Sequence, residues 1–275
     1  MLKEQLQKNN FTFKKSLGQN FLSDDNLLRA IVCDAGIDQD SVVLEIGAGA
    51  GTLTKRIAET ARKVYAVEID NRLQPLLTEQ FKDQPNVQFI FGDVMKIFDQ
   101  VVQKIAEPFF VVANIPYYLT TELALMVAKC PLCKSATLTI QKEVAYRLAS
   151  QVGGKDYGSV SVVVQSVADV DVTRVVDRKM FMPQPDVDSA VIRMDFDRAK
   201  NGIEDFDFFM KVVKACFAMR RKTLNNNLKN SFNFSCTMEE LLQPLGISPS
   251  ARAETLTVHQ FVELSNRIKN CLIKK

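Results

Sequence analysis

The sequence has one histidine and no apolar run near the roughly 20 residues that a membrane-spanning helix requires. The single His259 excludes a catalytic mechanism that depends on several histidines. The first 21 residues contain no apolar stretch of the kind found in secretory signal peptides. From these absences we expect a cytoplasmic protein without a membrane partner.

Cysteine is present but forms no recognisable metal or disulfide pattern. The six cysteines are scattered through apolar or helical segments, which favours reduced thiols and again a cytoplasmic location. Cys130 and Cys133 have the CxxC spacing of half a zinc site or of a redox motif, but the chain has no second CxxC. We therefore expect no metal site and interpret this pair as incidental thiols at a helix end.

The composition, with 47% hydrophobic and 24% charged residues among 275, is typical of a globular protein with one large domain or a medium and a small one. The net charge of +3 is unevenly placed. Residues 1–22 contain four lysines and one acid, and residues 211–229 contain six cations and no acid. These basic segments indicate local contact with a polyanion, with solvated helix faces as the simpler alternative.

Short apolar segments alternate with helical ones over the first two thirds of the chain. The expected strands cover residues 42–46, 64–69, 87–91, 109–113, 136–140, 160–167, 171–176 and 190–196. The expected helices are one that Ser23 caps, then 52–59, 72–81, 98–106 and 121–128. This order predicts a doubly wound, Rossmann-like α/β sheet with ligand sites at the carboxyl ends of its strands.

The pattern changes near Asp197, where residues 198–207 are typical of a linker. Beyond it we expect only helices, at residues 206–219, 222–230, 238–244 and 257–271. The sequence therefore predicts an α/β domain over residues 1–197 and a small all-helical domain over residues 198–275.

A glycine-rich turn and two carboxylates follow the first three expected strands. The turn has the spacing G-x-G-x-G from Gly47, not the G-x-G-x-x-G of a pyrophosphate site. Glu68 ends the second strand, where a carboxylate can accept hydrogen bonds from ribose hydroxyls. Asp93 follows the third strand, where its carboxylate can accept a hydrogen bond from an adenine amino group. These features fit a nucleoside ligand without phosphates, and S-adenosylmethionine fits best.

The tetrapeptide Asn114-Ile115-Pro116-Tyr117 follows the fourth expected strand. An adenine amino group is a poor nucleophile because its lone pair is delocalised into the ring. The side-chain carbonyl of Asn114 and the backbone carbonyl before Pro116 can accept both amino hydrogens and favour the pyramidal form. Tyr117 can stack on the base so presented. The turn therefore predicts in-line methyl transfer to a planar amine, without a metal or a covalent intermediate; an ordinary strand-to-loop turn is the alternative.

A dinucleotide-dependent oxidoreductase is the competing enzyme class. It would share the glycine turn and Glu68, but the phosphate-binding spacing is absent and the Asn114 turn would have no role.

Seven segments together resemble the ribosomal RNA adenine N6,N6-dimethyltransferase family, and within it the small-subunit (16S) branch. They are KSLGQNFL (15–22), EIGAGAGTLT (45–54), VEID (67–70), GDV (92–94), NIPY (114–117), FMPQPDVDS (181–189) and FAMRRKTL (217–224). The erythromycin-resistance methyltransferases of large-subunit rRNA are the nearest alternative. DNA adenine and protein glutamine methyltransferases share the amine-presenting turn, but segments 15–22 and 181–189 argue against them.

The resemblance implies dimethylation of two adjacent adenosines in the 3′-terminal hairpin of 16S rRNA, using S-adenosylmethionine, late in small-subunit assembly. The implied cofactor contacts are Asn20, Leu22, Gly47, Glu68, Asp93 and Asn114. Beside Asn114, the aromatics Tyr117 and Phe181 are expected to stack on the target base. Arg220, Arg221 and Lys222 are the expected contacts to rRNA phosphates.

The partner implied by this resemblance is 16S rRNA within the small subunit or its precursor, rather than DNA. Nothing in the sequence requires an oligomer, so we expect a monomer. A role in binding only, as an assembly factor or a transcription-factor-like relative, is the remaining alternative.

Overall fold

The computed structural model describes residue 11, residues 13–14 and residues 17–272 of the chain. Most of the expected N-terminal basic segment, and the first two residues of segment 15–22, lie outside this part. No helix in the described part is long and apolar enough to cross a membrane. The chain divides into two compact units, Met1–Ala145 with Asp171–Asp195, and Tyr146–Val170 with Phe196–Lys275.

A seven-stranded mixed sheet with the order β4-β3-β2-β5-β6-β9-β7 organises the first unit. Its strands are β2 (Val42–Ile46), β3 (Lys63–Glu68), β4 (Val87–Phe91), β5 (Phe109–Asn114), β6 (Cys133–Gln141), β7 (Ala168–Val176) and β9 (Ser189–Phe196). The strands from β4 to β6 are parallel, whereas β9 runs antiparallel to β6. A separate antiparallel pair joins β1 (Phe21–Leu22) to β8 (Phe181–Met182). The predicted doubly wound sheet is confirmed.

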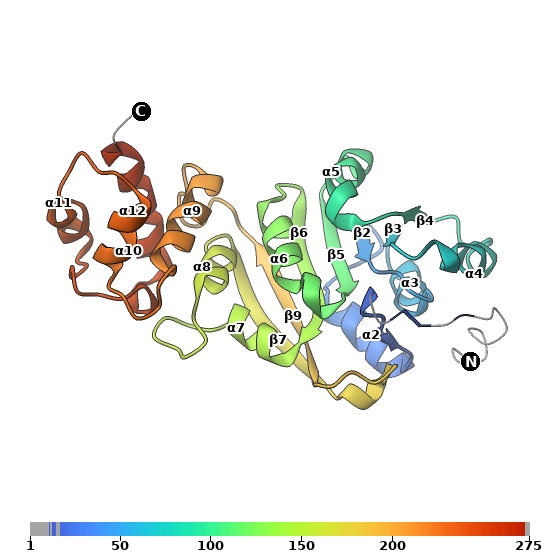
Figure 1. Ribbon diagram of the computed structural model, residues 1–275. Helices are drawn as coiled ribbons and strands as arrows, with labels where there is room; N and C mark the ends of the chain where they lie inside the picture. Colours follow the sequence, from blue (N-terminus) through green and yellow to red (C-terminus); the bar gives the residue numbers. More distant parts are fainter. Residues whose placement is uncertain (1–10, 12, 15–16, 273–275) are drawn as a thin grey trace. The chain divides into compact units, whose positions relative to one another are not determined.

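Helices cover both faces of this sheet. They are α2 (Asp25–Asp34), α3 (Thr52–Ala58), α4 (Gln74–Gln80), α5 (Val94–Ile105) and α6 (Thr120–Lys129), with the 3-10 turns η2 (Asn71–Leu73), η3 (Tyr117–Leu119) and η4 (Arg178–Met180). The first three helices lie on one face and α5 and α6 on the other (Figure 1). This follows from right-handed crossovers, because the strand order reverses direction between β4 and β5.

Two helices begin differently from the prediction. Asp24, not Ser23, caps α2, because its carboxylate accepts a hydrogen bond from the Leu27 amide at 2.8 Å. Asp93 caps α5 through the Met95 amide, so this helix begins at Val94 rather than at Phe98. The cap therefore holds the Asp93 carboxylate at the end of β4, beside the glycine turn.

The second unit is built from helices. They are α8 (Ser159–Gln165), α9 (Phe206–Cys216), α10 (Leu224–Ser231), α11 (Met238–Leu242) and α12 (Val258–Cys271), with η5 (Gln243–Leu245) and η6 (Ala253–Thr255); α7 (Lys142–Leu148) crosses the division between the units. α8 packs against α9 and α12, and α9 packs against α10 and α12 (Figure 1). The helical character predicted for the C-terminal region is confirmed.

The strand predicted over residues 160–167 is wrong, because Ser159–Gln165 form the helix α8. Its valines favour a strand intrinsically, but Val162, Val163 and Val164 are all buried in the helical unit. Tertiary burial thus overrides the local preference. Residues 146–170 group with the C-terminal helices for the same reason, so the compact units differ from the division predicted at residue 197.

Candidate cofactor and target-base site

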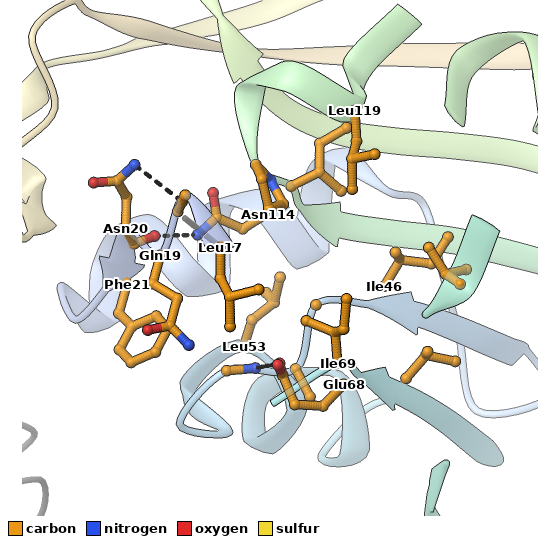
Figure 2. Close-up of a pocket in the computed structure, with 18 of the residues that line it drawn as sticks. Leu17, Gln19, Asn20, Phe21, Ile46, Leu53, Glu68, Ile69, Asn114 and Leu119 are labelled. Carbon is orange, nitrogen blue, oxygen red and sulfur yellow. Dashed lines mark hydrogen bonds between the residues drawn. The ribbon is translucent and has the colours of Figure 1, made fainter. Parts of the chain in front are cut away.

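A pocket opens where the parallel strands of the first unit end. Its wall comes from five stretches of chain, residues 17–22, 46–53 without Gly51, 67–69, 92–94 and 114–119. Parallel strands bring their carboxyl ends to one edge of a sheet, which is why these separate stretches meet. Figure 2 shows Asn20 beside Asn114, with Glu68 on another part of the wall.

The pocket brings together every residue predicted to contact the cofactor. These are Asn20, Leu22, Gly47, Glu68, Asp93 and Asn114. Tyr117 also lines the pocket, whereas Phe181 does not.

The glycine turn passes close to the end of β5. Gly47 has a φ of +81°, and a Cβ placed on it would lie 3.3 Å from the backbone oxygen of Asn114. Its amide donates a 2.9 Å hydrogen bond to the carbonyl of Val67, which ties the turn to β3. A glycine is therefore required here by both backbone conformation and space.

Glu68 is a buried carboxylate held by two backbone amides. Its side chain accepts a 2.7 Å hydrogen bond from the Gly49 amide and a 2.8 Å bond from the Asp70 amide. Burial raises the pKa of Glu68, and these two amides oppose that rise. Since each carboxylate oxygen can accept more than one hydrogen bond, Glu68 can still receive hydroxyl donors from a ligand.

A second carboxyl group, Glu45 on β2, lies in the core below this turn. It is 0% exposed, and Thr54 is the residue whose hydroxyl and backbone amide act on it as hydrogen-bond donors. Burial raises its pKa to about 8; the Thr54 side chain opposes this rise, and the negative charge of Glu68 adds to it. Burial therefore favours the neutral form of Glu45, which its place in the glycine-rich segment did not indicate.

Asn114 is held through its amide nitrogen. This nitrogen donates a 2.8 Å hydrogen bond to the backbone oxygen of Asn20 (Figure 2). The bond fixes the side-chain amide in the orientation that leaves its carbonyl oxygen as the uncommitted acceptor. Asn20 thus acts on Asn114 through its main chain, which its side-chain type could not reveal.

Tyr117, Tyr118 and Phe181 have different environments near this edge. Tyr117 is partly buried, and its hydroxyl lies 2.8 Å from the hydroxyl of Ser189. Tyr118 lines the pocket with 59% of its surface exposed and was not predicted, although it directly follows the NIPY turn. Phe181 is 5% exposed, opposite Leu22 in the β1–β8 pair and within the same apolar cluster. Its predicted stacking on a base would require that cluster to open.

The segment that forms one wall is anchored by side-chain hydrogen bonds. Gln19 donates a 2.9 Å bond to Asp70 and accepts a 2.9 Å bond from the amide of Lys14. Asp70 is paired with Arg72 at 2.6 Å, and this bond lowers the pKa of Asp70 to about 2. Gln19 therefore links the N-terminal segment to the loop that follows β3.

The basic residues predicted to contact RNA lie in the second unit. Arg220, Arg221 and Lys222 are exposed in the loop between α9 and α10. Arg220 donates a 2.7 Å hydrogen bond to the carbonyl of Lys155, and the buried Asn227 amide donates to the carbonyls of Cys216 and Met219. The loop is thus fixed at its base while its cations face solvent.

A family model described as ribosomal RNA adenine dimethylase matches residues 10–270 of the chain. The chain is 45% identical to Ribosomal RNA small subunit methyltransferase A of Geobacillus thermodenitrificans and 44% identical to that of Bacillus mycoides, over 97% of this chain and 94% of each relative. A solved dimethyladenosine transferase from Plasmodium falciparum has a TM-score of 0.78 and 25% identity, covering 91% of this chain and 98% of that one. The 23S rRNA methyltransferase ErmE has a TM-score of 0.70 and 28% identity, covering 91% and 100%.

Proposed function

The chain belongs to the ribosomal RNA adenine dimethylase family, and we propose that it dimethylates N6 of two adjacent adenosines in the 3′-terminal hairpin of 16S rRNA. It is an S-adenosylmethionine-dependent rRNA adenine dimethyltransferase. The observation that carries the choice of the small-subunit substrate is the near-full-length identity to small-subunit methyltransferases. We place the reaction late in small-subunit assembly, in the cytoplasm, with a monomeric enzyme.

The pocket fits S-adenosylmethionine, which supplies an electrophilic methyl group. Gly47 turns the chain at the pocket wall with a φ of +81°, and the anchored carboxylate of Glu68 can accept hydrogen bonds from the two ribose hydroxyls. The Asp93 carboxylate is fixed because it caps α5, and it can accept a hydrogen bond from the adenine amino group of the cofactor. Leu22 and Asn20 form the wall contributed by the N-terminal segment.

Asn114 prepares the target amine in this proposal. Its side-chain carbonyl and the backbone carbonyl of Ile115 accept the two N6 hydrogens, which turns the nitrogen lone pair out of the base plane. Tyr117 holds the base by stacking, which returns part of the free energy spent when the base leaves its helix. Orientation of the two reactants is then the main catalytic contribution, of the order of 7–11 kcal/mol in well-aligned reactions.

The exposed cations of the second unit are the proposed contacts to rRNA. Arg220, Arg221 and Lys222 would bind phosphates, giving an affinity that depends on salt but little on base sequence. Charge complementarity with the rRNA backbone supports this role, as does the absence of acids from residues 211–229.

The test is a transfer assay with labelled S-adenosylmethionine, followed by nucleoside analysis. The substrates are small-subunit particles from cells that lack the modification, free 16S rRNA, large subunits and DNA. We expect N6,N6-dimethyladenosine in the small-subunit particles alone. Label in large subunits would instead assign the protein to the erythromycin-resistance branch of the family. Cofactor binding without label in any substrate would favour the role of an assembly factor that binds but does not methylate.

A further inference from the structure

Ser189 is a buried serine whose hydroxyl reaches the edge of the proposed target-base site. Its oxygen lies 2.8 Å from the Tyr117 hydroxyl, although the two residues are 72 positions apart in the sequence. Both residues belong to the first unit. Ser189 ends segment 181–189, in which only Phe181 has a predicted role.

The position of the Ser189 hydroxyl is set by the sheet. Ser189 is 0% exposed, begins β9 and pairs with Gln141 at the end of β6. The adjacent residue Asp188 accepts a 3.0 Å hydrogen bond from the Lys142 amide, which closes this end of the strand pair. A side chain on such a doubly anchored strand end has little freedom to move.

Tyr117 has weaker local support. It begins η3, a 3-10 helix of only one turn. This turn has no side-chain cap and is closed by the hydrogen bond from the Leu119 amide to the Pro116 carbonyl. Its ring is partly buried, and burial raises the pKa of its hydroxyl, which therefore stays protonated and can share a hydrogen bond with Ser189. The contact with Ser189 holds the far end of the ring, so it restricts the tilt of the ring.

We propose that Ser189 is a positioning residue for methyl transfer, because its hydroxyl fixes the tilt of the Tyr117 ring and so the plane in which the target adenine stacks. This inference rests on the proposed function of Tyr117. A ring held from its far end presents the same face to an adenine and to its singly methylated product. Both transfers then occur on a base held in one plane.

The experiment compares Ser189→Ala, Tyr117→Phe and the double variant in the full-length protein, with undermethylated small-subunit particles as substrate. Each single variant should lower kcat/KM about threefold to tenfold, as expected for the loss of one hydrogen bond. The double variant should be no worse than either single variant, because both remove the same contact. Cofactor affinity and the unfolding temperature are measured in parallel.

Ser135→Ala is the matched control. Ser135 is also a buried serine of the same sheet, on β6, but its hydroxyl has no hydrogen-bond partner among the described residues. This variant should leave kcat/KM unchanged. A comparable loss in Ser135→Ala would show that removing any buried hydroxyl disturbs the sheet, and would overturn the proposal.

Other outcomes separate this inference from the function on which it rests. If Ser189→Ala lowers activity by the same further factor in the Tyr117→Phe background, Ser189 acts independently of Tyr117 and the inference is wrong. Unchanged activity of Ser189→Ala, beside a large loss in Tyr117→Ala, would also overturn it while leaving Tyr117 as the stacking residue. Unchanged activity of Tyr117→Ala would remove the proposed role of Tyr117 itself, and the inference with it.

Discussion

Asn114 is anchored at its nitrogen end, and this determines what the residue can do. With the amide nitrogen donating to the backbone of Asn20, the carbonyl oxygen remains to accept a hydrogen from an amine. A carboxamide held the other way round would present a donor and would repel an amino group. The orientation, more than the presence of an asparagine, makes the turn suitable for amine activation.

Replacement of Asn114 by alanine should therefore act on the chemical step. We expect Asn114→Ala to lower the single-turnover rate about 100-fold or more, the scale seen when one preorganised hydrogen bond to a transition state is removed. Cofactor affinity, measured by calorimetry, should fall far less than the rate, because Asn114 is only one of six predicted cofactor contacts in the pocket. Asn86→Ala is a suitable control, because the Asn86 amide also donates to backbone carbonyls but lies outside the pocket wall. Near-normal turnover in Asn114→Ala would refute the assignment.

Glu68 should affect cofactor binding first. Glu68→Gln keeps the size of the side chain but replaces one acceptor oxygen with a donor, which then faces a ligand hydroxyl or one of the two amides. Hydrogen bonds to charged groups contribute about 1.5–3 kcal/mol, so we expect cofactor affinity to fall at least about tenfold. Equilibrium dialysis with labelled cofactor measures the change. The exposed Glu122 provides the control Glu122→Gln, which should bind normally.

The buried carboxyl group of Glu45 should make the stability of the fold depend on pH. Its pKa in the folded protein is about 8, above the ordinary value of 4.5, so the folded state takes up a proton between these values. Its contribution to stability is present below about pH 4.5 and is lost as the pH rises through 8. Glu45→Gln, which mimics the neutral acid, should therefore gain stability over the native protein as the pH rises.

Chemical denaturation at several pH values tests this expectation. The difference in free energy of unfolding between Glu45→Gln and the native protein should grow by more than about 1 kcal/mol from pH 5 to pH 8. A difference that does not depend on pH would mean that Glu45 is ionised in the folded protein.

At the scale of elements, the N-terminal segment forms a wall of the pocket without being part of the sheet. It is held by the β1–β8 pair, by the bond from Thr52 to the Leu22 carbonyl at 2.8 Å, and by Gln19. Phe21 and Leu22 are anchored by burial, whereas Gln19 is held by hydrogen bonds, so a change at Gln19 should affect the wall without unfolding it.

Gln19→Ala tests this dependence. It removes the hydrogen bond to Asp70 but leaves the Asp70–Arg72 pair intact, so cofactor affinity should fall about threefold to tenfold with little change in the unfolding temperature. Gln103→Ala, at an exposed position on α5, is the control. Affinity equal to that of the native protein would show that the β1–β8 pair and the Thr52 bond hold the wall without Gln19.

The elements also show where prediction from the sequence succeeds and fails. The bounds of β2 and β4 agree with the prediction residue for residue, because each is a short, mainly apolar run of β-favouring residues between polar turns. The valine run of α8 looks the same locally, yet it forms a helix packed on α9 and α12. Only the neighbours of such a run distinguish the two outcomes.

At the scale of the whole molecule, the cofactor pocket belongs to the first compact unit and the cations Arg220, Arg221 and Lys222 belong to the second. The pocket requires a sheet edge, whereas the cations require an exposed loop between helices. We therefore expect substrate binding and cofactor binding to be separable by mutation.

Charge reversal of Arg220, Arg221 and Lys222 to glutamate should weaken binding to small-subunit particles while leaving cofactor affinity unchanged. If all three side chains bind phosphates, the salt dependence of particle binding should weaken. The slope of the logarithm of the association constant against the logarithm of the salt concentration should shrink by about 0.7–0.9 for each phosphate that is no longer neutralised. The control reverses Lys82, Lys104 and Lys129, three exposed lysines of the first unit, and makes the same change in net charge. Equal particle binding by both triple variants would identify the basic loop as an ordinary solvated surface.

The sequence by itself determined the order of the elements and the residue types at the strand ends. That is sufficient to place Gly47, Glu68, Asp93 and Asn114 in one pocket, because parallel strands share an edge at their carboxyl ends. It did not determine how these side chains are held. Asn114 and Asn20 are 94 positions apart, and Tyr117 and Ser189 are 72 apart. Such contacts, like the burial that protonates Glu45, exist only after packing, because a hydrogen bond or a desolvated charge depends on neighbours in space.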